Sequence, residues 1–241
     1  CSYSPYQSIS AFAGNFTLID PEPLAERGWL TEKDLFLPYE ANSGFINFDR
    51  VRPFKKDILE KAFHAFRTQS ADDADYRTFC EKEAYWLKDY ALFHAAKKEH
   101  GGAAWMEWPE EIKHRAPDAL NALAERQRDA VELDYFKQYV FHTQWNRLHA
   151  YARTKGIEIL GDMPIFIAQD SADVWAHQQL FDLNEDGSPH TVAGVPPDYF
   201  AVNGQLWGNP QYNWTAMAEE HYAWWKRRFR KLREQVDIIR I

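Results

Sequence analysis

Apolar residues recur at helical spacing in three separate stretches of the chain, with charged residues between them. Steps of three and four place such residues on one face of an α-helix. This pattern predicts amphipathic helices over 76–98, about 124–155 and about 218–232, with Gly101-Gly102 ending the first and Gly156 capping the second. The residues that form the three stripes are Cys80, Ala84, Leu87, Ala91 and His94; Phe141, Trp145, Leu148 and Ala152; and Ala218, Tyr222, Trp225, Phe229 and Leu232.

Two short apolar runs, "IEILGD" at 157–162 and "VDIIRI" at 236–241, are typical of strands buried on both faces. Because Pro164 has no N–H to donate, the first strand is expected to end near Asp162. The order helix, strand, long loop, helix, strand predicts the α/β class, with a parallel sheet or barrel.

The remaining segments are rich in proline and glycine. No long helix is expected within 1–55, and 105–117 is predicted to be irregular. The connection 164–213 is also predicted to be largely irregular, apart from a short helical turn around 172–177. Connections of this length are usually functional, and a barrel holds its active site in the loops that follow its strands.

Charge and cysteine content exclude several classes of protein. The net charge is −8, and the one cationic block, "KRRFRK" at 226–231, lies on a predicted helix, so nucleic acid is not expected as a partner. No apolar run is long enough for a membrane span. Cys1 and Cys80 are the only cysteines, which excludes a disulfide framework or a four-cysteine zinc site and favours a reducing, cytoplasmic location.

No cofactor is expected either. The nucleotide motifs GxGxxG and GxxxxGK[ST] are absent, and no HExxH spacing occurs among the nine histidines. "DLNEDG" at 182–187 matches the first half of a calcium loop, but Ala193 stands where a bidentate glutamate is needed. An Asx-rich turn is the alternative, and we predict no metal.

Two charged residues stand in the predicted strands. Asp162, at the end of an apolar strand, either caps a turn or faces a cleft. Arg240 shares a strand face with Ile238 and with the position that follows Ile241. A buried arginine needs an acidic partner on its face, and that position is the expected one.

Aromatic residues make up 16% of the sequence. Such side chains serve either core packing or the binding of sugar rings. The loop 194–214 carries several of them beside Asp198, and it is either an Ω-loop packed on itself or a loop that presents its rings to a ligand. Its aromatic residues are Tyr199, Phe200, Trp207, Tyr212 and Trp214.

Five segments in this order resemble the 4-α-glucanotransferase family, also called amylomaltase or disproportionating enzyme, within the α-amylase superfamily. They are "SPYQSISAFAGN" (4–15), "WMEWPEE" (105–111), "GDMPIFIAQDSADVWAH" (161–177), "VAGVPPDYFAVNGQLWGNPQYNW" (192–214) and "DIIRI" (237–241). The resemblance implies a partial (β/α)8 TIM barrel, truncated at both ends, as a single catalytic domain over 1–241. A mostly helical inserted subdomain is expected within 20–130.

The same resemblance implies roles for individual residues. Tyr6 matches a tyrosine that stacks on the sugar beside the scissile bond, and Asp162 matches a carboxylate at the substrate. Arg240 matches an arginine that keeps the nucleophilic aspartate ionised, and that aspartate is expected directly after Ile241. A lid-like loop along the glucan groove is matched by Asp198, Tyr199, Phe200 and Trp207. "CSY" at 1–3 departs from the Gly-Asp of many relatives, so acceptor contacts there are not carried over.

The implied activity is a retaining transfer of α-1,4-glucan segments without metal or cofactor, on maltooligosaccharides, amylose and glycogen-derived dextrins. A retaining pair of carboxyl groups is about 5 to 5.5 Å apart, and neither is expected within these 241 residues, so this chain alone is predicted to be inactive. An amylase-like hydrolase and a non-catalytic glucan-binding module are the alternatives.

Overall fold

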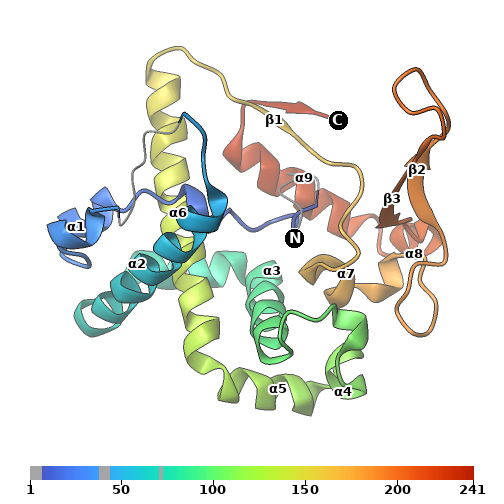
Figure 1. The fold of residues 1–241 in the computed structure, drawn as a ribbon, viewed down its shortest axis with the longest axis horizontal. Coiled ribbons are helices and arrows are strands. Elements are labelled where there is room, and N and C mark those ends of the chain that lie inside the picture. The colour runs from blue at the N-terminus through green and yellow to red at the C-terminus, as the bar shows by residue number, and fades with distance from the viewer. Residues whose placement is uncertain (1–6, 38–43, 71–72) are drawn as a thin grey trace.

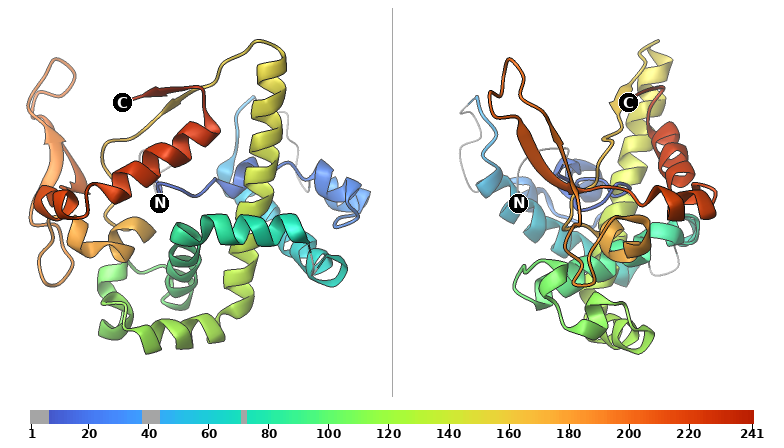
Figure 2. Two further views of the ribbon diagram at one scale, coloured as in Figure 1. Left: turned by 180° about the vertical axis from the view of Figure 1, so that it is seen from behind. Right: turned by 90° about the vertical axis from the view of Figure 1, so that its right-hand side faces the viewer.

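The structure is a computed structural model that describes residues 7–37, 44–70 and 73–241 (Figure 1). Most of the molecule is helical, with one small parallel sheet beside the helices and a second sheet, an antiparallel hairpin, that projects at one edge (Figure 2). The described helices are α1 (Glu22–Glu26), α2 (Phe48–Gln69), α3 (Ala74–Glu99), α4 (Glu110–Lys113), α5 (Pro117–Arg126), α6 (Arg128–Thr154), α7 (Ala172–Ala176), α8 (Trp214–Glu219) and α9 (Ala223–Gln235). The strands are β1 (Leu160–Asp162), β2 (Val192–Val195), β3 (Gln205–Pro210) and β4 (Ile238–Arg240).

The two longest helices, α3 and α6, were both predicted, and they pack against each other. The predicted stripes are only partly buried, because Ala84 and Leu148 are exposed. The Asp73 side chain accepts the N–H of Tyr76 and caps the start of α3. At the end of α6, Gly156 has a φ of 68°, and the N–H of Ile157 bonds to the carbonyl of Ala152. The C-terminal cap predicted at Gly156 is therefore confirmed.

The helix content of the N-terminal part was underestimated. α2 begins at Phe48, within the stretch where no long helix was expected, and contains Pro53. Asn47 caps this helix through Arg50 N–H, and the buried face beyond Pro53 outweighs the hydrogen bond that proline cannot donate. Similarly, the segment before α6 holds α4 and α5, so the second long helix begins at Arg128.

The third predicted helix is two helices. His221 and Tyr222 have φ values of 54° and 56°, so the chain reverses locally between α8 and α9. The apolar stripe from Ala218 to Leu232 therefore belongs to two elements, and the prediction of one continuous helix is wrong.

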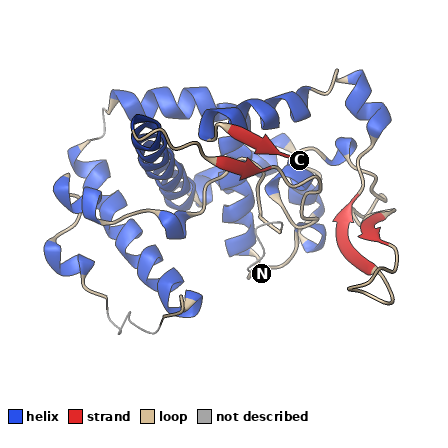
Figure 3. Cartoon of the chain, turned by 90° about the horizontal axis from the view of Figure 1, so that it is seen from above, coloured by secondary structure: helices blue, strands red, loops and turns tan. Residues whose placement is uncertain are grey.

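β1 and β4 form a parallel pair, as predicted, with Leu160 opposite Ile238, Gly161 opposite Ile239 and Asp162 opposite Arg240. β2 and β3 form a separate antiparallel hairpin, which Figure 3 shows apart from the parallel pair. The hairpin lies in the connection 164–213, where no strand was predicted. The expected α/β class holds, with helix predominating.

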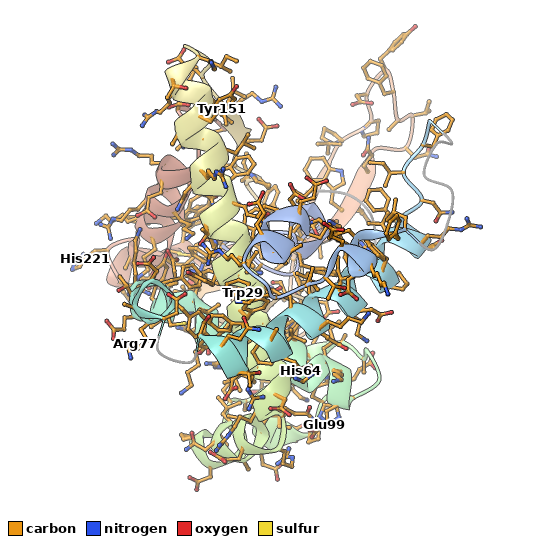
Figure 4. The ribbon with its side chains drawn as sticks, turned by 90° about the vertical axis from the view of Figure 1, so that its left-hand side faces the viewer. Trp29, His64, Arg77, Glu99, Tyr151 and His221 are labelled. Atoms are coloured by element: carbon orange, nitrogen blue, oxygen red, sulfur yellow. The ribbon has the colours of Figure 1, made fainter. Side chains whose placement is uncertain are left out.

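The buried side chains form two clusters. One surrounds α3, α7 and α9, with Trp105, Trp175 and Trp224 fully enclosed. The other joins α1, α2 and α6 around Trp29 and Phe136. Figure 4 shows Trp29 inside this second cluster and Tyr151 near the free end of α6. The helices therefore supply most of the packed core, and the two small sheets are attached to it.

Candidate functional site

Asp162 and Arg240 lie together at the carboxyl ends of the parallel strands. Arg240 Nε donates to Asp162 Oδ1 at 2.5 Å, and Nη2 contacts Oδ2, which gives a two-point pair. The side chains are 66% and 31% exposed for Arg240 and Asp162, respectively. The expectation of a buried Arg240 is therefore wrong, and a carboxylate on the neighbouring strand is its partner. Asp162 faces open space, as the cleft interpretation requires.

The pair borders a pocket of about 610 Å³. Trp207 and Phe166 also line it and meet edge-on, with the ring centres 6.2 Å apart. The pocket thus combines aromatic surface with charged and amide groups, which is the composition of sites that hold sugar rings. Its lining residues are Gln7, Asp162, Met163, Pro164, Ile165, Phe166, Trp207, Asn209, Arg240 and Ile241.

Trp207 reaches this pocket from the β2–β3 hairpin. Its indole Nε1 donates to Gln205 Oε1 at 3.1 Å, and the side chain remains 43% exposed. Gly194 lets the strands approach closely, because a Cβ there would lie 2.3 Å from the Gln205 carbonyl oxygen. The hairpin therefore holds one indole at the pocket and leaves a face of it open.

The tip of the hairpin does not line the pocket. Asp198 Oδ1 accepts the N–H groups of Phe200 and Ala201 at 2.9 and 2.7 Å, so this carboxylate caps a turn. Tyr199 and Phe200 are 94% and 91% exposed, with their rings perpendicular. The tip is not an Ω-loop packed on itself, whereas Tyr212 at the base of the same loop is buried.

Three of the predicted site residues are thus brought together, namely Asp162, Trp207 and Arg240. Asp198, Tyr199 and Phe200 lie together at the hairpin tip, and Tyr6 lies outside the described residues. Its neighbour Gln7 does line the pocket.

Sequence reasoning missed Gln7, Phe166 and Asn209 as pocket residues. Gln7 Nε2 donates to Asn209 Oδ1 at 3.2 Å, and the two come from segments far apart in the chain. Gln7 follows Tyr6 in "SPYQS", Phe166 belongs to "GDMPIF", and Asn209 follows Trp207 in "WGNP". These three residues could have been found only because they belong to the segments that resemble the family. Their residue types alone do not single them out.

The carboxylate of Asp237, directly before β4, fixes the strand pair. Asp237 accepts the N–H of Ile159 at 2.9 Å, His149 Nε2 at 2.9 Å and Arg153 Nε at 2.8 Å. The backbone bond from Ile159, with the bonds from His149 and Arg153, lowers the pKa of Asp237 to about 2. This residue therefore ties β4 to the segment before β1 and to α6.

The described residues contain no group of three or more metal-ligating side chains. In the calcium-like segment, Asp182 accepts from Thr191 at 2.7 Å, and Asp186 accepts from the backbone and hydroxyl of Ser188 at 2.9 and 2.6 Å. Asp186 thus caps a turn, which is the alternative considered for that sequence, and Asp182 bonds across the loop to the segment that precedes β2. In the described ranges, no helix combines the length and apolar character needed to cross a bilayer.

Comparison with known proteins gives consistent matches. A sequence profile of the family described as 4-alpha-glucanotransferase matches residues 1–241. The 4-alpha-glucanotransferases of Thermus thermophilus and Aquifex aeolicus are 44% and 43% identical to the chain, covering 99% of it and 47% of each relative. A solved amylomaltase from Streptococcus agalactiae in complex with acarbose is 36% identical, with a TM-score of 0.92 over 99% of this chain and 48% of that one. The chain spans about half the length of these relatives.

Proposed function

Because this chain belongs to the 4-alpha-glucanotransferase family, we propose that the protein transfers α-1,4-glucan segments to the 4-hydroxyl of an acceptor glucan or of glucose. The observation that carries the proposal is the pocket in which Asp162, Arg240 and Trp207 meet. A carboxylate and a guanidinium can bind sugar hydroxyls, while an indole face covers the apolar face of the ring.

The proposed substrates are maltooligosaccharides, amylose and glycogen-derived dextrins. An open, aromatic pocket on the exposed edge of the strand pair suits a chain-like ligand that extends past it. The Streptococcus agalactiae amylomaltase, which has a similar fold, was solved in complex with acarbose.

In this proposal the strand pair belongs to a (β/α)8 barrel, and 1–241 forms one partial catalytic domain that includes a helical subdomain within 20–130. β1 and β4 are parallel neighbours, and the helix α9 leads directly into β4. Asp162 and Arg240 then stand at the carboxyl ends of barrel strands, the face where barrel enzymes hold their substrates.

Each site residue receives a distinct role. Asp162 binds sugar hydroxyls, Trp207 stacks on a ring, and Tyr199 and Phe200 contact the glucan beyond the pocket from the tip that Asp198 shapes. Tyr6 stacks beside the scissile bond. Arg240 supports the nucleophilic aspartate expected directly after Ile241.

The mechanism proposed is a retaining double displacement, in which a glycosyl-enzyme forms and a sugar hydroxyl then replaces the enzyme carboxylate. Transfer requires that the acceptor sugar reaches this intermediate before water does. Trp207, by covering one side of the pocket, favours the sugar through stacking and reduces the space open to water.

Incubation of the intact enzyme with maltotriose tests the proposal. Transfer gives glucose together with maltooligosaccharides longer than maltotriose. Glucose and maltose alone would indicate an amylase-like hydrolase. Retention on immobilised amylose without turnover would indicate a glucan-binding module.

A further inference from the structure

The pocket wall that follows β1 has no regular secondary structure. The last ladder bond runs from Met163 N–H to the Arg240 carbonyl at 2.9 Å. Beyond it, side chains from distant segments hold the carbonyl groups of the wall. Ile167 O accepts from Asn209 Nδ2 at 2.9 Å, and Gln169 O accepts from Trp105 Nε1 at 2.8 Å. The conformation of the wall is therefore set by donors outside it.

Two further donors act at the centre of the wall. Arg228 Nη2 on α9 donates to Pro164 O, and its Nη1 lies 3.5 Å from both Ile165 O and the Tyr212 hydroxyl oxygen. The Tyr212 hydroxyl itself donates to Ile165 O at 2.6 Å. Both side chains are buried, Arg228 at 3% exposure and Tyr212 at 5%. The two carbonyls are thus held by one connected network.

Arginine at position 228 suits this arrangement of two carbonyl groups better than lysine would. Within the described part of the chain, Arg228 makes no carboxylate contact within ion-pair distance, and burial lowers its pKa. The rings of Trp224 and Trp225 cover the guanidinium at 5.5 and 5.0 Å. Burying a cation is costly, and the planar fork of arginine can direct two nitrogens at neighbouring carbonyls, whereas a lysine offers one.

The peptide that they hold lies between two pocket residues. Asp162 precedes Pro164 by two positions, and Phe166 directly follows Ile165. Both line the 610 Å³ pocket, and both also border the neighbouring pocket that Arg228 lines. A shift of the Pro164–Ile165 carbonyls would move the carboxylate and the ring against which Trp207 packs.

We propose that Arg228 and Tyr212 are positioning residues of the glucan pocket, which fix the Pro164–Ile165 backbone and thereby hold Asp162 and Phe166 in their binding geometry. The inference rests on the proposed function. Neither residue touches the substrate, and their effect is transmitted through the two carbonyl groups.

The test uses Arg228→Met, Arg228→Lys and Tyr212→Phe in the intact enzyme, with Arg230→Met as control on the exposed face of the same helix. Calorimetry gives the Kd for maltoheptaose, kinetics with maltotriose give kcat and KM, and circular dichroism gives the folded fraction. We expect Arg228→Met to raise Kd and KM about tenfold, the loss typical of a charged hydrogen-bond donor. Tyr212→Phe should raise Kd and KM by a smaller factor than Arg228→Met does. Arg228→Lys should have an effect between those of these two variants, and the Arg230→Met control should match wild type.

A purely structural role would lower the folded fraction, and with it the apparent kcat, at unchanged KM and Kd. That result would overturn the inference. If Arg228→Met does not fold, Tyr212→Phe, which removes one oxygen atom, decides the same question. A wild-type protein that binds maltoheptaose without transferring glucan would overturn the proposed function alone, because the Kd comparison would still test the positioning residues.

Discussion

Asp162 and Arg240 face each other across the parallel pair of β1 and β4, joined by two nitrogen–oxygen contacts at the carboxyl ends of the strands. Exposed ion pairs of this kind stabilise a fold by only about 0 to 1 kcal/mol. Their position beside an aromatic pocket therefore favours a role in binding over a role in folding.

Asp162→Asn should lower kcat/KM for maltotriose about a hundredfold while leaving the melting temperature nearly unchanged. The amide keeps the shape of the side chain but loses the charge that pairs with Arg240 and that, in the proposed function, binds sugar hydroxyls. Asp118→Asn, an exposed aspartate on α5, is the control. A large loss of melting temperature at unchanged kcat/KM would instead make Asp162 a structural residue of its turn.

The pairing of Asp162 with Arg240 shows which features of the site can be predicted from the sequence and which cannot. The end of the first strand near Asp162 could be predicted from an apolar run and from Pro164, and the parallel order followed from the alternation of helices and strands. The register that sets Asp162 opposite Arg240 joins residues 78 positions apart, which no local pattern encodes. The acidic partner of Arg240 was therefore sought on its own strand, at the position after Ile241, and the pairing with Asp162 on the neighbouring strand was not foreseen.

The hairpin and the helix break were missed for related reasons. "VAGV" and "QLWGNP" contain glycine and proline in place of a polar and apolar alternation, so they did not predict strands. The stripe through Tyr222 continued the helical period, but the backbone there is left-handed, a conformation rare for tyrosine and set by its surroundings. In the hairpin and at the helix break alike, tertiary contacts override local preference.

Trp207→Ala should increase hydrolysis relative to transfer about fivefold, because the lost ring stacking is of the order of 1 kcal/mol and acts on the acceptor sugar. The measurement is the ratio of glucose and maltose to longer products from maltotriose. Tyr151→Ala, which removes an exposed ring near the free end of α6, is the matched control (Figure 4). An unchanged ratio would remove Trp207 from the proposed exclusion of water.

The buried pair of Glu83 and Lys231 predicts a large effect on stability. Lys231 Nζ lies 2.7 Å from Glu83 Oε1, both side chains are about 5% exposed or less, and Trp86 Nε1 donates to the other carboxylate oxygen. Glu83→Gln should lower the free energy of unfolding by about 3 to 5 kcal/mol, because it leaves the lysine charge buried without a counter-charge.

Adding Lys231→Met to Glu83→Gln should recover part of that loss, since the uncompensated charge is then absent. Urea denaturation of the two single variants and the double variant measures the coupling. Additive losses would show that the two charges do not interact as the geometry indicates.

Asp173 predicts a pH dependence of stability. Its carboxylate is buried and accepts the N–H of Ala11 at 2.7 Å and a bond from the Ser10 side chain. The charged group that faces it is Arg228, and the Tyr212 hydroxyl, which is uncharged, lies in the same network. Burial raises the pKa of Asp173 to about 6 despite the opposing effects of the Ala11 bond and the Arg228 charge. The unfolded chain, with a pKa of about 3.9, therefore releases this proton first as the pH rises.

This group accordingly lowers the free energy of unfolding between about pH 4 and pH 6, by about 3 kcal/mol in total, and the loss persists above pH 6. Asp173→Asn retains an oxygen for Ala11 N–H but cannot ionise, so it should lack this decline and be the more stable protein at pH 7. Urea denaturation of both proteins at several pH values between 4 and 7 gives the difference between their free energies of unfolding. The contribution of Asp237, whose pKa is about 2, is the same in both proteins and cancels in this difference. If the stability curves of the wild type and Asp173→Asn were parallel across that range, Asp173 would be ionised throughout. The Arg228 charge would then hold it ionised, and Asp173 and Arg228 would form an ion pair in the buried network.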